Sequence, residues 1–191
     1  MEQEVLTLDG GPLSGPEVVA VARKGMHVEI SPLATELMEA ARATVEQVTS
    51  TDSATYGINT GFGALSTTRI DNENLTDLQM NLLRSHAAGV GEPLEGEIVR
   101  GMMVLLAANL CRGHSGVRPA VAQCIVEMLN AGVTPIVPSR GSVGASGDLA
   151  PLSHLALVLC GEGNAMLGEK IMPGKAAMAA AGITTIVPVE K

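Results

Sequence analysis

The sequence is short of aromatic residues: its 191 residues include one tyrosine, one phenylalanine and no tryptophan. The core must therefore be built from leucine, valine, alanine and methionine, and hydrophobic residues make up 46% of the chain. A chain of this length can bury one sizeable core or two small ones. The single tyrosine, Tyr56, lies in a glycine-rich loop rather than in an apolar run. Its position therefore draws attention to that loop.

Basic residues are also scarce, with 12 lysines and arginines against 20 aspartates and glutamates and a formal net charge of −8. Nucleic acids and anionic membranes select basic surfaces. The sequence contains no basic cluster with interleaved aromatic residues. We therefore expect no nucleic-acid partner and no membrane partner.

Cysteines are few and odd in number, and Cys111, Cys124 and Cys160 all lie in apolar, helix-like runs. This usage predicts reduced, buried thiols in a cytoplasmic protein. The first residues, "MEQEVLTLDG", do not resemble a signal peptide, and the run "MMVLLAANL" is too short to cross a membrane. Only Cys111 and His114 in "CRGH" could form a pair of metal ligands. We expect no metal site from so few ligands.

Apolar spacing and helix start signals predict that most of the chain is helical. Ser14 and Ser31 each stand just before a helix start that contains proline. The second helix has apolar residues at helical spacing, namely Leu33, Leu37, Met38, Ala41 and Val45. Further helices are expected at 75–88, 97–111, 119–130 and 149–160 and in an alanine-rich segment after 174. Strand-like pieces at 5–8 and 27–31 and an extended "VTPIVP" complete the prediction, and 161–174 reads as irregular. The fold class is mainly α with short β pieces.

The segment "GSVGASGDLAPLSHLA", residues 141–156, combines a glycine-rich turn with a helix start. Asp148 stands in the N-cap position, and Pro151 falls in the first helical turn, where its missing N–H costs little. In "ASG", the amide nitrogen of Gly147 can attack the carbonyl of Ala145 if the backbone bends tightly, and loss of water closes a five-membered ring. Loss of water from Ser146 then leaves an exocyclic alkene, which is an electrophile. Spacing alone favours an ordinary tight turn that enters a helix.

The same segment resembles the signature of the aromatic amino-acid ammonia-lyase and aminomutase family. Two other segments resemble family motifs in the same order: "TYGINTGFGALS" resembles the loop with the catalytic tyrosine, and "NLLRSHAAGVGEPL" resembles the segment that contacts substrate. The resemblance implies that Ala145, Ser146 and Gly147 condense into 4-methylidene-imidazol-5-one, abbreviated MIO, with no metal and no dissociable cofactor. Residues 1–191 would then be the N-terminal domain, with the tyrosine loop at 50–66, the contact segment at 81–94 and the MIO loop at 141–149.

The resemblance also implies roles for individual residues in the elimination of ammonia from an amino acid. The electrophile improves the amine as a leaving group, while Tyr56 takes the β-proton as a general base. Gly63 would contact the substrate, and Asn59 with Thr60 and Gly61 would shape the loop that brings the tyrosine close. Asp148 would assist cyclisation from beside the ring. Tyr56 as a packing residue and Asp148 as a structural cap are the simpler alternatives.

His86 is the residue that the resemblance assigns to substrate recognition. The pair Ser85-His86 is similar to that of histidine-specific members, and an imidazole can exchange hydrogen bonds with a substrate imidazole. This implies conversion of L-histidine to urocanate. Some tyrosine-acting aminomutases share the pair, so a tyrosine or phenylalanine aminomutase or lyase stays open. A helix-end histidine bonded to backbone carbonyls is the structural alternative.

The chain is shorter than family members, which continue into a long helical bundle and assemble as homotetramers. We therefore expect an N-terminal part that lacks most of the bundle, through truncation, a split enzyme or cleavage after Lys191. The missing half would be a partner as a second chain or a removed segment. The alternative from another class is a non-catalytic oligomerisation fragment that keeps the fold but never forms the ring.

Overall fold

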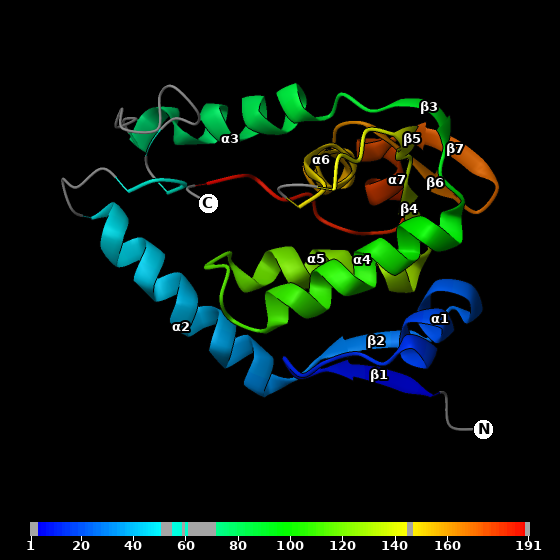
Figure 1. Cartoon of the computed structure of the whole chain (residues 1–191), viewed down its shortest axis with the longest axis horizontal. Coiled ribbons are helices and arrows are strands. Elements are labelled where there is room, and N and C mark those ends of the chain that lie inside the picture. The colour runs from blue at the N-terminus through cyan, green and yellow to red at the C-terminus, as the bar shows by residue number, and fades with distance from the viewer. Residues whose placement is uncertain (1–3, 51–54, 59, 61–71, 145–146, 190–191) are drawn as a thin grey trace.

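The computed structural model describes residues 4–50, 55–58, 60, 72–144 and 147–189. Its fold class is mainly α with short strands, as the sequence predicts (Figure 1). The helices and strands gather around one core of aliphatic and methionine side chains, among which Met103, Ile125 and Leu155 are fully buried.

The N-terminal unit is a strand, a helix and a second strand. Strands β1 (Val5–Leu8) and β2 (His27–Ile30) pair in parallel, and α1 (Gly15–Lys24) connects them. Ser14 and Glu17 cap the helix reciprocally, side chain to backbone in both directions, and Gly25 ends it in the left-handed region. The predicted strands and the predicted start of this helix are confirmed.

The centre of the molecule is the helix pair α4 (Gly96–Cys111) and α5 (Pro119–Ala131). Both helices bury small and large apolar side chains and pack side by side (Figure 1). Strands β4 (Val133–Pro135), β6 (Asn164–Leu167) and β7 (Lys170–Pro173) form an antiparallel sheet, and β3 (Val90–Pro93) pairs with β5 (Pro138–Arg140). The expectation of irregular structure over 161–174 is wrong, because this segment folds into the β6–β7 hairpin.

Helix α2 (Pro32–Thr49) is confirmed, and Met38 and Val45 of its predicted apolar stripe are buried. Leu33 and Leu37 are exposed, whereas Arg42 is buried and its guanidinium bonds the Glu46 carboxylate at 2.9 Å. Burial of a charged group is tolerated here because the partner lies one turn further along the same helix.

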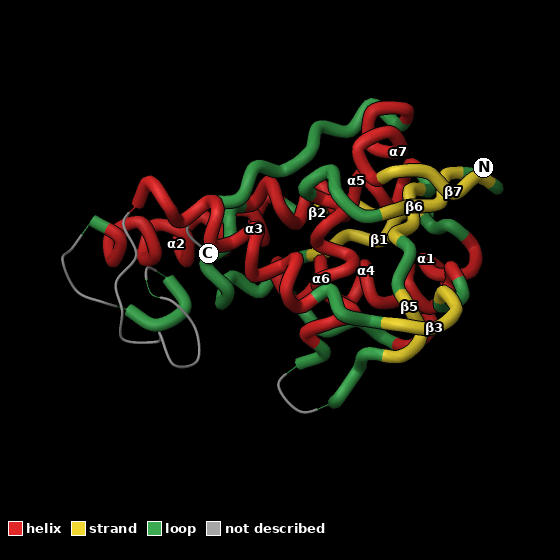
Figure 2. The backbone as a smooth tube through the Cα atoms, turned by 90° about the horizontal axis from the view of Figure 1, so that it is seen from above, coloured by secondary structure: helices red, strands yellow, loops and turns green. Residues whose placement is uncertain are grey.

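The last layer is built by α3 (Asn72–His86), α6 (Leu149–Leu159) and α7 (Gly174–Ala180). Helix α3 runs along the top of the molecule in Figure 1 and packs on α6. The C-terminal segment is held between helices, since Thr76 donates to the Pro188 carbonyl at 3.1 Å and Arg118 donates to the Val187 carbonyl. Figure 2 shows α2 and α3 at one end of the molecule and the strands at the other.

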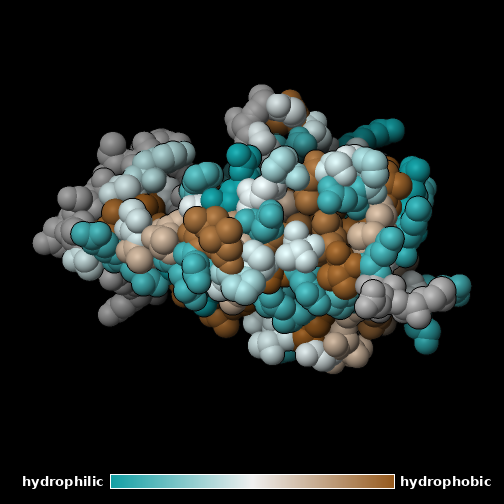
Figure 3. Space-filling view, turned by 90° about the horizontal axis from the view of Figure 1, so that it is seen from below, coloured by the Kyte–Doolittle hydropathy of each residue, from teal (hydrophilic) through white to brown (hydrophobic). Residues whose placement is uncertain are grey.

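Polar and apolar side chains are interspersed on the face that carries α1, α2 and the β1–β2 pair (Figure 3). Large apolar side chains stay exposed on several elements, including Leu105 on α4 and Leu149 on α6, which are about half exposed. Within the described ranges, no helix combines the length and apolar character needed to cross a membrane.

The turn between α4 and α5 supports a first prediction. Gly113 has φ +69°, and a Cβ there would lie 2.6 Å from the Leu37 carbonyl oxygen on α2. Gly113→Ala combines left-handed strain with a backbone clash, so the free energy of unfolding should fall by about 3 kcal/mol. Gly132→Ala is the matched control, because Gly132 has φ +74° but nothing within 4 Å. The control should cost about 1 kcal/mol, and equal losses for the two variants in urea unfolding would contradict the packing.

Candidate active site

The loop of residues 141–149 turns tightly onto the start of α6. Gly144 and Gly147 have φ values of +65° and +81°, and Asp148 has φ +51°, the one positive φ among the described non-glycine residues. Such angles cost a residue with a Cβ about 1–2 kcal/mol. Ala145 and Ser146 lie outside the described residues. The described ends of this loop are therefore sharply bent on both sides of the Ala-Ser pair.

Asp148 occupies the N-cap position of α6, as predicted, but it does not cap the helix with its side chain. Its left-handed backbone turns the carboxylate away from the helix, and the carboxylate accepts a hydrogen bond from the Ser142 hydroxyl instead. The carbonyl of Asp148 accepts the first helical bond, from Leu152 at 3.2 Å. The predicted side-chain cap is thus wrong, and the Asp148–Ser142 contact closes the base of the loop.

A cavity of about 500 Å³ lies between this loop and α4. Its volume falls in the range of small-molecule sites. Gly147 and Asp148 form part of its wall, and Asn109 contributes an amide from α4. Asn109 is not among the site residues predicted from the sequence, although a polar residue inside the apolar run "MMVLLAANL" is a signal that indicates it. The other lining residues are mainly apolar: Leu94, Met102, Leu105, Leu106, Pro138, Ser139, Ser142, Pro151 and Leu152.

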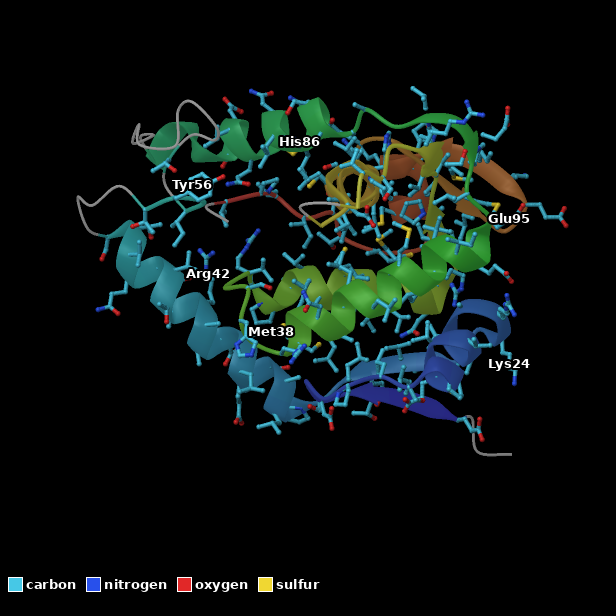
Figure 4. All side chains as sticks on the ribbon, in the orientation of Figure 1. Lys24, Met38, Arg42, Tyr56, His86 and Glu95 are labelled. Carbon is cyan, nitrogen blue, oxygen red and sulfur yellow. The ribbon has the colours of Figure 1, made fainter. Side chains whose placement is uncertain are left out.

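His86 is the last residue of α3 and is half-buried (Figure 4). Its Nδ1 lies 2.8 Å from the Leu82 carbonyl oxygen. A carbonyl only accepts, so Nδ1 carries a proton, and in the neutral ring Nε2 presents a lone pair. The structural alternative, a helix-end histidine bonded to a backbone carbonyl, therefore holds for Nδ1. Nε2 of the neutral ring can still accept a hydrogen bond.

Tyr56 lies in the short turn 55–58 and is 65% exposed. Figure 4 shows it near the start of α3, whereas His86 lies at the end of that helix, so the chain does not bring the two residues together. Thr60 is buried. Asn59, Gly61 and Gly63 lie outside the described residues. Of the predicted site residues, the cavity wall contains Gly147 and Asp148.

The thiols are unsuited to act as nucleophiles at neutral pH. Burial raises the pKa of Cys111 and of Cys160 to about 11, and that of Cys124 to about 12. All three are unpaired, as the sequence predicts. The part of the chain that the structure describes holds no cluster of three or more His, Cys, Asp or Glu side chains suited to a metal ion.

Two contacts that the sequence did not indicate surround the end of α3. Arg84 binds the Glu162 carboxylate with two guanidinium nitrogens. Nε donates to Oε2 of Glu162 at 3.0 Å, and Nη2 donates to Oε1. This pair lowers the pKa of Glu162 through the hydrogen bond from Arg84. The backbone N–H of Gly89 donates to Nε2 of His154 on α6 at 3.1 Å. Both contacts join segments more than 60 residues apart, which periodicity cannot reveal.

Known proteins match the chain along nearly its whole length. The histidine ammonia-lyase of Gloeobacter violaceus is 54% identical over 181 residues, which are 95% of this chain and 35% of that protein. Ergothionase from Treponema denticola, solved with desmethyl-ergothioneine sulfonic acid, matches with a TM-score of 0.94 and 32% identity over 98% of this chain and 37% of its own. Histidine ammonia-lyase from Trypanosoma cruzi matches with a TM-score of 0.88 and 39% identity, over 97% of this chain and 36% of its own.

The chain thus spans about a third of the length of the relatives that it matches. The family model described as aromatic amino acid lyase matches residues 13–191. Together with the fold similarity, this match shows that the chain belongs to the aromatic amino acid lyase family.

Proposed function

We propose that the chain supplies the N-terminal part of an ammonia-lyase that removes ammonia from L-histidine to give urocanate. The observation that carries the proposal is the sharply bent 141–149 loop on the wall of an apolar cavity, in a chain of this family with a histidine ammonia-lyase relative at 54% identity. By the family resemblance, the assembled enzyme is a cytoplasmic homotetramer.

The described ends of the loop fit self-condensation of Ala145, Ser146 and Gly147 into MIO. Ring closure needs the Gly147 nitrogen to approach the Ala145 carbonyl, and the left-handed Gly144 and Gly147 favour such compression. One water leaves in that closure and a second leaves from the Ser146 side chain. Once formed, the ring supplies an electrophilic carbon that makes the substrate amine a better leaving group.

The chain's own residues would then handle the proton and the substrate ring. In this proposal Tyr56 acts as the general base that removes the β-proton. His86 Nε2, left as an acceptor by the Nδ1 bond to Leu82, accepts the N–H of a substrate imidazole. Gly63 contacts the substrate, and Asn59 supports the loop of Tyr56. Asp148, held by Ser142, keeps the base of the ring loop closed.

Substrate choice can be tested by complementing the chain with the part of the Gloeobacter violaceus enzyme that lies beyond the matched segment. We expect the assembled pair to form urocanate from L-histidine and little product from tyrosine or phenylalanine, measured by absorbance and chromatography. A β-amino acid product would instead favour an aminomutase. A complex that assembles without turnover of any of the three would favour an oligomerisation fragment and contradict the proposal.

A further inference from the structure

The segment that follows His86 is interlocked with the start of the 141–149 loop. A Cβ at Gly89 would lie 3.0 Å from Nε2 of His154 and 3.2 Å from Cβ of Pro138. A Cβ at Gly141 would lie 3.1 Å from the Gly89 Cα. Both positions are tighter than an ordinary Cβ contact, and at Gly141 the close neighbour is the Gly89 backbone. Gly89 therefore packs closely against the start of the 141–149 loop.

His154 is the side chain that holds this contact from α6. Its Nε2 accepts the Gly89 N–H at 3.1 Å, so that nitrogen must be unprotonated. The imidazole is half-buried, and this burial lowers the pKa of His154. A protonated ring would have two donors and could not accept the amide hydrogen.

The charged groups that face His154 come from α3 and from the turn after α6. Arg84 shares with His154 a cavity of about 340 Å³, whose other lining residues are uncharged. The Arg84 guanidinium is paired with Glu162, which follows α6. Arg84 and Glu162 therefore engage each other, and burial rather than a neighbouring charge lowers the pKa of His154.

We propose that His154 is a positioning residue: its neutral imidazole holds the turn at Gly89, and through it His86, against the start of the 141–149 loop. The Arg84–Glu162 pair fastens the same helix end on the other side of His86. Helix α6 follows the 141–149 loop, contains His154 and is followed by Glu162, so the loop and both contacts with the end of α3 lie on one element and its flanks. This inference rests on the proposed function only for the role of His86.

The contact can be measured in the chain itself by NMR with uniform ¹⁵N labelling. We expect a scalar coupling across the hydrogen bond between the Gly89 nitrogen and His154 Nε2, and strong protection of the Gly89 amide from exchange above about pH 7. Because the folded pKa lies below the ordinary value near 6.5, protection should persist to about that pH and be lost as the pH falls further. The loss should be about tenfold, as for one hydrogen bond.

Variants separate this role from general stability. His154→Gln keeps an acceptor and should retain protection without the pH dependence, whereas His154→Leu should lose about tenfold at every pH. His114→Leu is the matched control, since His114 is exposed in the α4–α5 turn, and it should leave Gly89 unchanged. A Gly89 amide that is unaffected by pH and by His154→Leu, in a chain whose other amides stay protected, would overturn the inference.

The effect of His154 on substrate binding is measured as KM and kcat in the complemented enzyme. His154→Leu should raise KM for L-histidine about tenfold at neutral pH, with less effect on kcat, and His154→Gln should restore it. Loss of the Gly89 contact without any change in KM would overturn the positioning role. If the proposed function itself fails, the ring or urocanate will be missing while the Gly89–His154 coupling is still present, so the two failures are distinguishable.

Discussion

Replacing Ser146 by alanine should abolish turnover by the complemented enzyme, with a loss of at least about 10³-fold. Alanine has no hydroxyl to lose as water, so the exocyclic alkene cannot form even if the backbone condenses. The near-UV absorbance of the conjugated ring should disappear with it. Activity and spectrum are measured on the same preparation, beside the intact mass.

Ser14→Ala is the matched serine control, because Ser14 caps α1 in a different part of the fold. This variant should lose about 1 kcal/mol of stability while keeping the spectrum and the activity of the parent. A Ser146→Ala protein that still forms urocanate at a comparable rate would show that the reaction does not depend on this serine, and the assignment of Ala145, Ser146 and Gly147 would be wrong.

Replacing Tyr56 by phenylalanine should lower kcat of the complemented enzyme by about 10² to 10⁴-fold, the usual range for loss of a general base. The change removes the hydroxyl and keeps the ring, and Tyr56 is 65% exposed. Little change in the free energy of unfolding is therefore expected. KM should change little, because the hydroxyl acts in removal of the β-proton and not in binding of the substrate.

The same variant distinguishes the base from the electrophile. Tyr56→Phe should still lose two water molecules from its mass, whereas Ser146→Ala should not. Unchanged kcat in Tyr56→Phe would assign the tyrosine to packing, and loss of the ring in that variant would mean that Tyr56 acts in cyclisation rather than in elimination.

The helices could be predicted because their start and stop signals are local. Ser14 with Glu17, Ser31 before Pro32, and Gly132 after α5 all satisfy the ends of their own helices. Such contacts involve residues three or four positions apart, so the sequence displays them directly.

The β6–β7 hairpin was missed because its strands are only four residues long and neither alternates cleanly. The informative signal was the two-residue turn between them, Gly168-Glu169, in which Gly168 has φ +62°. The buried face of α2 is predicted only in part: Met38 and Val45 are buried, but the stripe also includes exposed leucines. Leu33 and Leu37 fit the helical period, but the neighbouring elements cover the side with Arg42 instead.

In the candidate site, the sequence predicts the chemistry of each segment but not the contacts between segments. The bends around Ala145 and Ser146 follow from glycines that can be read directly. The bond from Ser142 to Asp148 occurs with Asp148 in the left-handed region, which aspartate tolerates better than most residues but which the sequence does not dictate. The pairing of Gly89 with His154 depends on how α3 packs on α6.

The most direct test of the account is the intact mass of the purified chain. We predict a mass that is lower than the sequence mass by two water molecules. Ser146→Ala is the reference, because alanine has no hydroxyl and the variant cannot lose the second water. One tyrosine and no tryptophan give a low background, so the near-UV spectrum of the same sample should show the conjugated ring. An unmodified mass, both in the chain alone and in the complemented enzyme, would contradict the central claim that this loop makes its own electrophile.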